Sequence, residues 1–119
     1  MNKPLQAKPA RGEIWSIRLD PVQGHEQAKT RPCLIVSHNK FNKSGADLVI
    51  VVPLTSKNKH IPLHIKIAST DSGLSVESFI MPEHIRALSI QRCITCVGVV
   101  PMHILLAVEE KIKLLLDFE

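Results

Sequence analysis

Aromatic side chains are scarce in this sequence. They make up 3 % of the 119 residues, and the four present are Trp15, Phe41, Phe79 and Phe118. Protein modules that bind RNA by stacking bases on a β-sheet need several exposed aromatic side chains. The scarcity argues against such a stacking platform, so any contact with nucleic acid is expected to involve phosphate and polar groups.

Long apolar runs are also missing. No stretch approaches the ~18 consecutive apolar residues that a membrane-spanning helix needs. The first ten residues contain two lysines and two prolines, without the continuous apolar segment of a secretory signal. The three cysteines are an odd number. We therefore expect a reduced, cytoplasmic protein that makes no membrane contact.

The sequence has no clustered metal ligands and no Gly-rich phosphate loop. Its eleven acidic residues are scattered, whereas a metal-dependent phosphodiesterase needs several convergent carboxylates. His60 and His64 are four residues apart, but on the strand predicted for this segment they would lie about 13 Å apart on one face. We interpret them as surface or interface histidines, and we expect no bound metal and no cofactor.

Cys93 and Cys96 form a CxxC motif, and no second CxxC accompanies it. Residues i and i+3 of a strand point to opposite faces, so the two sulfur atoms are not expected to converge. Buried small side chains are therefore favoured over a zinc or redox site.

The residues that are present describe a basic globular domain. Hydrophobic residues make up 45 % of the chain, and 15 Lys plus Arg against 11 Asp plus Glu give a net charge of +4. The length fits one domain, and the charge is compatible with a polyanionic partner. We expect a flexible N-terminal tail over residues 1–10 and a single domain over residues 11–119.

Short strands separated by polar turns dominate the pattern. Six segments show the alternation or the short apolar runs of strands: residues 11–19, 32–37, 48–52, 60–67, 75–81 and 93–100. Pro53 interrupts the third and indicates a bulge or a sheet edge, and residues 82–86 are interpreted as a link. After Pro101, apolar residues recur at three- and four-residue intervals, which predicts an amphipathic helix. The fold class is therefore mainly β, a partial barrel of strongly bent antiparallel strands with a C-terminal α-helix.

One junction carries the candidate chemistry. Pro32 lacks an N–H and suits the first position of a strand, and it favours an extended backbone at Arg31. Arg31 therefore lies where a polar loop meets a rigid sheet, with Glu26 upstream on the loop. A fixed cation with an acid on a flexible loop suits phosphate chemistry, although a solvated arginine is the plainer interpretation of the same pattern.

Several separate motifs occur in one order along the chain. They are Arg11-Gly12-Glu13-Ile14-Trp15, Asp20-Pro21, Gly24-x-Glu26-Gln27, Thr30-Arg31-Pro32, Ile35-Val36-Ser37, Val51-Val52-Pro53-Leu54-Thr55-Ser56 and Ile85-Arg86-Ala87-Leu88. In these motifs, from residue 11 to about residue 116, the sequence resembles the MazF/PemK family of toxin endoribonucleases. Agreement of several motifs in order is a specific signal.

The resemblance implies an SH3-like barrel with a C-terminal helix that works as a homodimer. It also implies a toxin, an mRNA interferase of a type II toxin–antitoxin system, which a cognate antitoxin neutralises. Such toxins cleave single-stranded RNA at short sequences without a metal. The 2′-hydroxyl of the RNA attacks the adjacent phosphodiester, which leaves 2′,3′-cyclic phosphate and 5′-hydroxyl ends.

The resemblance places Arg31 and Thr55 at the catalytic centre. Arg31 suits the stabilisation of phosphorane oxygens, because a guanidinium is planar and permanently charged. Thr55 can donate a hydrogen bond to the same phosphate. Glu26 is the candidate general base, and His25, which replaces a serine common at that position, is the alternative. The expected RNA-binding residues are Lys29, Thr30, Ser56, Lys57, Lys59, Arg86 and His25.

Two other interpretations stay open at this point. A gyrase poison of the CcdB type would share the fold without hydrolytic activity, but that family acts through a C-terminal tryptophan-glycine-isoleucine, and this chain ends Leu115-Leu116-Asp117-Phe118-Glu119. A non-catalytic basic adaptor of SH3-like shape gives no reason for Arg31, Thr55 and Glu26 to converge in space. Convergence of these side chains is therefore the observation that separates the interpretations.

Overall fold

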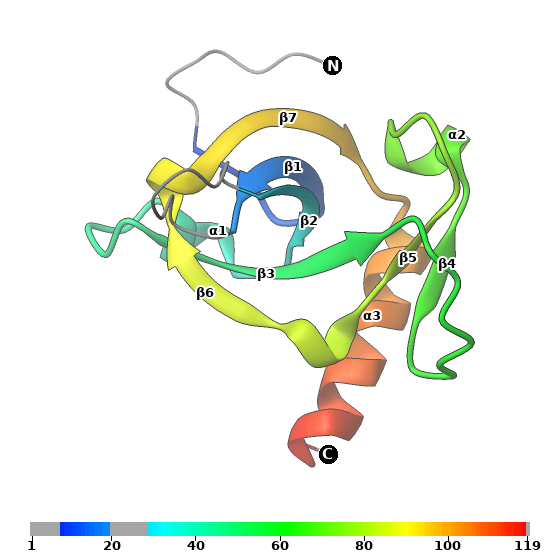
Figure 1. Ribbon diagram of the computed structural model, residues 1–119. Coiled ribbons are helices and arrows are strands. Elements are labelled where there is room, and N and C mark those ends of the chain that lie inside the picture. Colours follow the sequence, from blue (N-terminus) through cyan, green and yellow to red (C-terminus); the bar gives the residue numbers. More distant parts are fainter. Residues whose placement is uncertain (1–7, 20–28, 119) are drawn as a thin grey trace.

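The computed structural model describes residues 8–19 and 29–118, which form a curled antiparallel sheet and one long helix (Figure 1). The strands are β1 (Glu13–Arg18), β2 (Thr30–Ile35), β3 (Leu48–Thr55), β4 (Ile65–Ile67), β5 (Ser78–Ile80), β6 (Arg86–Ser89) and β7 (Cys93–Val99). The helices are α1 (Asn39–Asn42), α2 (Ser69–Ser72) and α3 (Met102–Leu116), with 3₁₀ turns η1 (Pro82–His84) and η2 (Ile90–Arg92). The strand order is β4-β5-β3-β2-β1-β7, and β6 also pairs with β3. This mainly β half-barrel with a C-terminal helix confirms the predicted fold class.

β3 is central to the sheet, and Pro53 marks the point where one of its neighbours changes. Residues 48–51 pair with β6 and residues 54 and 55 pair with β5, while the other edge of β3 pairs with β2. Pro53 has no N–H to donate to a ladder, and its carbonyl accepts a hydrogen bond from the Met81 amide at 3.0 Å. The strand therefore continues through Pro53 to Thr55 instead of ending at residue 52.

Two apolar clusters form the core, one on each face of the sheet. The cluster beneath α3 includes Ile14, Leu34, Val36, Val52, Leu54, Ile67, Ile80, Ile104, Leu105 and Val108. The second cluster, in the hollow of the curl, includes Trp15, Ile17, Cys33, Ile35, Val49, Val51 and Leu88. Neighbouring strand residues alternate between the two clusters, as the period of two requires.

Helix α3 packs on the first cluster through its buried face. Ile104, Leu105 and Val108 are buried there, and burial of such side chains contributes roughly 1.5–3 kcal/mol each. An ion pair joins Glu109 of α3 to Arg11, which also donates to the Val36 carbonyl. The predicted amphipathic C-terminal helix is confirmed.

Two sequence predictions about strands are wrong. In the segment 60–67 only β4 is a strand; His60 has a φ of +55°, and the His64 amide donates to the Ile61 carbonyl in a turn. Pro62 explains the error, because it cannot donate to a sheet ladder although the apolar alternation continues through it. The segment 82–86 is η1 as far as residue 84, but β6 begins at Arg86 and was not predicted.

Residues 8–10 pack against the start of the barrel. Pro9 is buried, and the Ala10 amide donates to Glu13 Oε1 at 2.6 Å. Residues 1–7 lie outside the described residues, so the boundary between tail and domain at residue 10 stays a prediction. No helix in the described part of the chain is long and apolar enough to cross a membrane.

Candidate active site

Arg31 and Thr55 lie on neighbouring strands, β2 and β3. β2 and β3 pair antiparallel, with Cys33 opposite Pro53 and Leu34 opposite Val52. Arg31 and Thr55 each lie two residues beyond the Cys33–Pro53 pair, at the start of β2 and the end of β3. Both residues line one pocket, so the fold brings them to the same place, and their catalytic roles stay predictions.

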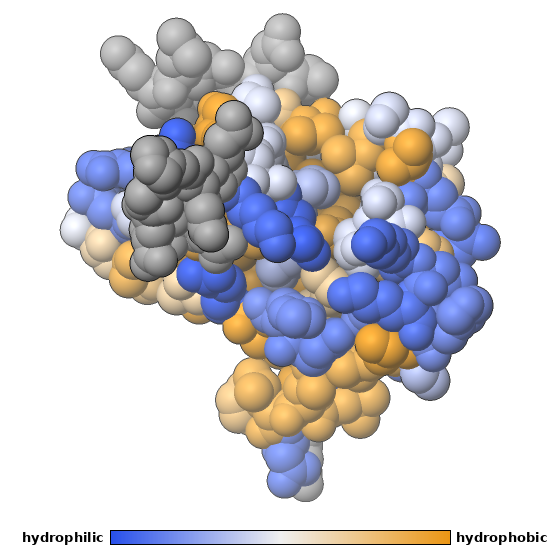
Figure 2. Space-filling view, viewed as in Figure 1, coloured by the Kyte–Doolittle hydropathy of each residue, from blue (hydrophilic) through white to orange (hydrophobic). Residues whose placement is uncertain are grey.

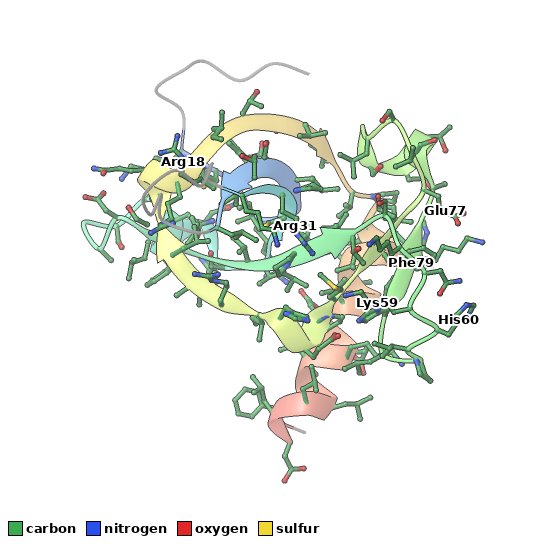
Figure 3. The ribbon with its side chains drawn as sticks, in the orientation of Figure 1. Arg18, Arg31, Lys59, His60, Glu77 and Phe79 are labelled. Atoms are coloured by element: carbon green, nitrogen blue, oxygen red, sulfur yellow. The ribbon has the colours of Figure 1, made fainter. Side chains whose placement is uncertain are left out.

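The larger pocket at Arg31, which we call the Thr55 pocket, has a volume of about 480 Å³. It is lined by Arg31, Pro32, Leu54, Thr55, Ser56, Lys57, Lys59, Leu74, Ser75, Val76 and Ser78. Figure 3 shows the Arg31 side chain beside β3 on the side of the molecule that also carries Lys59. With three cations and several hydroxyl groups on its walls, the pocket suits a polar, anionic ligand.

A second pocket shares Arg31 with the first. This Arg86 pocket has a volume of about 360 Å³ and is lined by Leu19, Lys29, Arg31, Pro53, Met81, His84 and Arg86. Arg86 enters it from β6, where it lies opposite Val51 of β3. Arg31 therefore stands at the border of two cationic pockets, each of which adds further positive charge of its own.

The charges of Arg31 and Arg86 converge on one buried atom, the thiol of Cys33. Burial, together with the nearby Cys93, raises the pKa of the Cys33 thiol to about 12, while Arg31 and Arg86 act in the opposite direction. Within residues 8–19 and 29–118, no carboxylate forms an ion pair with Arg31. A phosphate would therefore find concentrated positive charge here.

Thr55 keeps a hydroxyl hydrogen available for a ligand. Its Oγ1 accepts a hydrogen bond from the Lys57 amide at 3.2 Å. A hydroxyl has one O–H donor and two acceptor lone pairs, so this bond orients Thr55 without using its donor. The O–H can be directed at an anion in the Thr55 pocket.

The far wall of the Thr55 pocket is fixed by a close contact between α2 and β7. The pocket-lining residues between 74 and 78 follow Gly73, which ends α2 with a φ of +78°. A Cβ at Gly73 would lie 2.3 Å from the Val97 carbonyl oxygen, and a Cβ at Gly98 would lie 2.5 Å from the Ser72 carbonyl oxygen. Only glycine allows this approach of two backbones, so the contact sets where the far wall begins.

The other predicted site residues fall into three groups. Ser56, Lys57 and Lys59 line the Thr55 pocket, and Lys29 and Arg86 line the Arg86 pocket. Thr30 is exposed at the start of β2 and lines neither of these two pockets. Glu26 and His25 lie outside the described residues, so their roles stay predictions.

The sequence did not predict the far wall of the Thr55 pocket or His84 of the Arg86 pocket. The wall reaches the site because β5 pairs with the end of β3, where Leu54 lies opposite Ile80. Turn residues in segment 69–73 were visible in the sequence, but nothing there shows which strand the next segment will join. The sequence does not indicate that β5 pairs with β3, and this pairing brings the wall to the site.

The histidine interpretation is half right. His60 is exposed, but the side chain of His64 is only 3 % exposed, and its Nε2 lies 2.5 Å from Glu83 Oε2. The two do not share a strand face, because residues 60–64 form turns. No group of three or more His, Cys, Asp or Glu side chains among residues 8–19 and 29–118 is arranged to hold a metal ion.

The prediction that Cys93 and Cys96 point to opposite faces is wrong. In the β1–β7 pair, Cys93 lies opposite Ile17 and Cys96 opposite Trp15, with a register shift that leaves Ile94 as an extra residue. This bulge lets residues i and i+3 share a face, and both cysteines pack on the second cluster with Cys33. Burial raises the pKa of the Cys93 thiol to about 11, which keeps it protonated and unreactive at neutral pH.

Comparison with known proteins gives a consistent result. A family model described as "PemK-like, MazF-like toxin of type II toxin-antitoxin system" matches residues 10–116. The chain is 35 % identical over 112 residues to endoribonuclease MazF9 of Mycobacterium tuberculosis, covering 90 % of this chain and 95 % of that protein. It is 34 % identical over 83 residues to endoribonuclease MazF of Staphylococcus epidermidis, covering 69 % of each.

The fold is also similar to solved structures. The crystal structure of MazE-MazF from Deinococcus radiodurans matches with a TM-score of 0.83 and 26 % identity, over 96 % of this chain and all of that one. The likeness extends over the half-barrel and its C-terminal helix.

Proposed function

Because the chain belongs to the PemK-like, MazF-like toxin family of type II toxin–antitoxin systems, we propose that it is an endoribonuclease that cleaves single-stranded RNA at specific sequences. Curated relatives carry the name endoribonuclease. The structural observation that supports the proposal is the position of Arg31, which lines one pocket together with Thr55 and lies at the border of two cationic pockets. A strand of RNA that crosses this border would bring one phosphate to Arg31 and place a nucleotide in each pocket.

The proposed reaction is an attack by the RNA on itself, without a metal. The 2′-oxygen forms a bond to the adjacent phosphorus, and the bond from phosphorus to the 5′-oxygen breaks, which gives 2′,3′-cyclic phosphate and 5′-hydroxyl ends. Negative charge gathers on the two non-bridging oxygens of the phosphorane. Arg31 can donate two N–H groups to them and Thr55 its O–H, and one such donor is worth roughly 10²–10³-fold in rate.

Two protons must also move in this reaction. The 2′-hydroxyl loses one as it attacks, and the leaving 5′-oxygen gains one. Glu26 remains our proposed base, with His25 as the alternative, and a placed proton-transfer group contributes roughly 10²–10⁴-fold. Arg31 does not suit this role, because a guanidinium stays protonated at neutral pH.

We propose two protein partners and a cytoplasmic site of action. The cationic pockets suit an acidic segment of a cognate antitoxin, which would compete with RNA for the same charges; the similar solved structure from Deinococcus radiodurans is named MazE-MazF. The end of α3 carries exposed apolar side chains, and we propose that a second copy of the chain covers them. Sedimentation velocity would show the dimer as a species of twice the chain mass.

The experiment that tests the activity is cleavage of a long RNA by purified protein in EDTA, with the new 5′ ends mapped. We expect a discrete set of cleavage sites, 5′-hydroxyl ends, and full activity in the chelator. Arg31→Ala should reduce the rate at least about 10²-fold, because the phosphorane loses its fixed cation. Arg18→Ala, which removes an exposed arginine of β1 that lines neither pocket, is the matched control.

Each part of the proposal has its own contradicting result. A folded Arg31→Ala protein that cleaves at the parental rate would remove Arg31 from the centre. Loss of cleavage in EDTA would contradict metal independence, and unphosphorylated 3′-hydroxyl ends would contradict attack by the 2′-oxygen.

A further inference from the structure

The loop between β3 and β4 carries the lysines of the Thr55 pocket, and the backbone amides of Lys57, His60 and His64 in it donate to acceptors within the same segment of the described chain. The Lys57 amide donates to Thr55 Oγ1 at 3.2 Å, the His60 amide to Asn58 Oδ1 at 2.9 Å, and the His64 amide to the Ile61 carbonyl at 3.0 Å. Bonds of this kind give a loop its shape. They do not fix its position relative to another element.

His64 connects the end of this loop to η1. Its Nε2 lies 2.5 Å from Glu83 Oε2, and its side chain is 3 % exposed. A carboxylate only accepts hydrogen bonds, so Nε2 carries the hydrogen and donates it. This contact reaches a separate element, unlike the three local bonds of the loop.

The contact between His64 and Glu83 has a cost in stability, which comes from the second ring nitrogen of His64. Its Nδ1 is buried without a hydrogen-bond partner among the described residues, and a buried unpaired polar atom lowers stability. An apolar side chain of similar size would avoid this loss. The feature that distinguishes histidine here is therefore the donor on Nε2, aimed at Glu83.

Glu83 in turn lies beside the Arg86 pocket. The next residue, His84, lines that pocket, and its Nε2 is 3.8 Å from the same Glu83 Oε2. Burial alone would raise the pKa of the Glu83 carboxyl, but the hydrogen bond from His64, a backbone amide and the two histidine charges together lower it. Glu83 is thus an anion at neutral pH that faces both His64 at the end of the lysine loop and His84 in the wall of the Arg86 pocket.

We propose that His64 is a positioning residue for RNA, which through Glu83 holds the loop of Lys57 and Lys59 at a fixed distance from the Arg86 pocket. An RNA that spans both pockets needs these cations in one arrangement before it binds. His64 lines neither pocket, so it acts through the loop and not on the reacting phosphate. This inference rests on the proposed function, because it assumes that RNA spans the two pockets.

The kinetic test compares three variants of His64. His64→Ala removes the donor, His64→Gln keeps an amide nitrogen near the place of Nε2, and His64→Asn places its amide nearer that of Nδ1. We expect His64→Ala and His64→Asn to raise KM for a short RNA roughly five- to tenfold, with kcat within about twofold, because uniform binding is weakened and the chemical step is not. In His64→Gln, KM should stay close to the parental value. Glu83→Ala and the double variant His64→Ala/Glu83→Ala should have the same KM and kcat as His64→Ala, since each of them removes the same interaction.

The control is His60→Asn, which changes an exposed histidine of the same loop, and asparagine tolerates the positive φ found there. This variant should leave KM and kcat unchanged. A fall in kcat with unchanged KM in His64→Ala, or no recovery in His64→Gln, would overturn the inference.

A second measurement does not depend on cleavage. Amide hydrogen exchange of the full chain should become faster over residues 56–64 in His64→Ala, with no change over β1 and β2. Unchanged exchange in the loop would overturn the inference even if the chain cleaves RNA. If the parental protein does not cleave RNA, the proposed function fails, and this exchange pattern alone decides whether His64 holds the loop.

Discussion

The guanidinium of Arg31 is the group on which the proposed chemistry depends. Arg31 lines both pockets, shares the larger one with Thr55, and like Arg86 acts to lower the pKa of the Cys33 thiol. A cation held by a strand loses little freedom when a phosphate arrives, so its attraction is preorganised. Thr55 adds a directed hydroxyl because the Lys57 amide already occupies one of its lone pairs.

Glu83 gives a prediction about acid stability. Its pKa in the folded chain lies below the ordinary value of 4.5, so the folded state binds fewer protons here than the unfolded state. The stabilisation is therefore fully present above the unfolded pKa and is lost as the pH falls through the folded pKa. The parental chain should exceed Glu83→Gln in free energy of unfolding at pH 7, and this difference should shrink below about pH 4.5.

Urea unfolding at a series of pH values measures that difference. Glu77→Gln removes the same charge from an exposed carboxylate 3.4 Å from Lys66, where solvent screens the pair. It should show a smaller change across the same pH range. If the difference in free energy of unfolding between the parental chain and Glu83→Gln stays constant from pH 7 to pH 3, the lowered pKa assigned to Glu83 is contradicted.

Among the elements, β3 and α2 determine the shape of the site. β3 pairs with β6 along its first half and with β5 at its end, so it brings Arg86 and the far wall of the Thr55 pocket to the same strand. α2 is pressed against β7 where Gly73 meets Gly98. The far wall therefore depends on a contact with β7, a strand that lines neither pocket.

Gly98→Ala tests this dependence. The new Cβ would lie 2.5 Å from the Ser72 carbonyl oxygen, so α2 must move away from β7. We expect a loss of roughly 1–3 kcal/mol in the free energy of unfolding and a change in the preferred cleavage sequence, because the wall that faces the RNA moves with α2. Gly45→Ala, where a Cβ meets nothing within 4 Å, is the matched control. Unchanged stability and cleavage sites in Gly98→Ala would show that the contact does not position the wall.

The elements differ in how far the sequence could predict them. α3 was predictable because its apolar residues repeat at the helical period, and its buried residues Ile104, Leu105 and Val108 follow that period. The alternation in segment 60–67 was misleading, because Pro62 breaks the ladder that the pattern suggests. β6 was missed because its four residues pair with β3, which is distant in the sequence, and carry no signal of their own.

Prediction of the candidate site from the sequence was limited in the same way. Arg31 and Thr55 were predicted as site residues because they lie in matching motifs, and Lys57 because it follows the second of these motifs; their roles stay predictions. His64 and the far wall of the Thr55 pocket depend on which segments meet across the sheet, which no local pattern contains. The bulge at Ile94, which turns Cys93 and Cys96 to one face, is likewise a property of the pairing with β1.

At the scale of the whole molecule, five cationic side chains line the two pockets, and these are Lys29, Arg31, Lys57, Lys59 and Arg86. Figure 2 shows polar residues over this face and apolar residues over the projecting end of α3. The chain carries a net charge of +4, but the excess matters for RNA only where cations line a groove. Binding should therefore depend steeply on salt and on the location of each lysine.

The salt dependence of RNA affinity tests this distribution. With a 2′-O-methylated RNA, which lacks the attacking hydroxyl, the double variant Lys57→Ala/Lys59→Ala should lower the slope of log affinity against log salt by roughly 1.4, about 0.7 for each phosphate that the protein no longer neutralises. Lys40→Ala/Lys43→Ala changes the net charge equally at exposed residues outside both pockets. It should leave the slope nearly unchanged, and an equal effect of the two double variants would contradict a localised site.

The exposed apolar side chains at the end of α3 have a consequence for how assembly of the protein depends on its concentration. The exposed apolar side chains there are Leu114, Leu115, Leu116 and Phe118. If a second copy covers them, assembly follows mass action, so a few molecules per cell would stay single while a burst of synthesis would pair them. Dimerisation through this helix end would then depend on copy number: the chain would be monomeric at low copy number and dimeric once it accumulates.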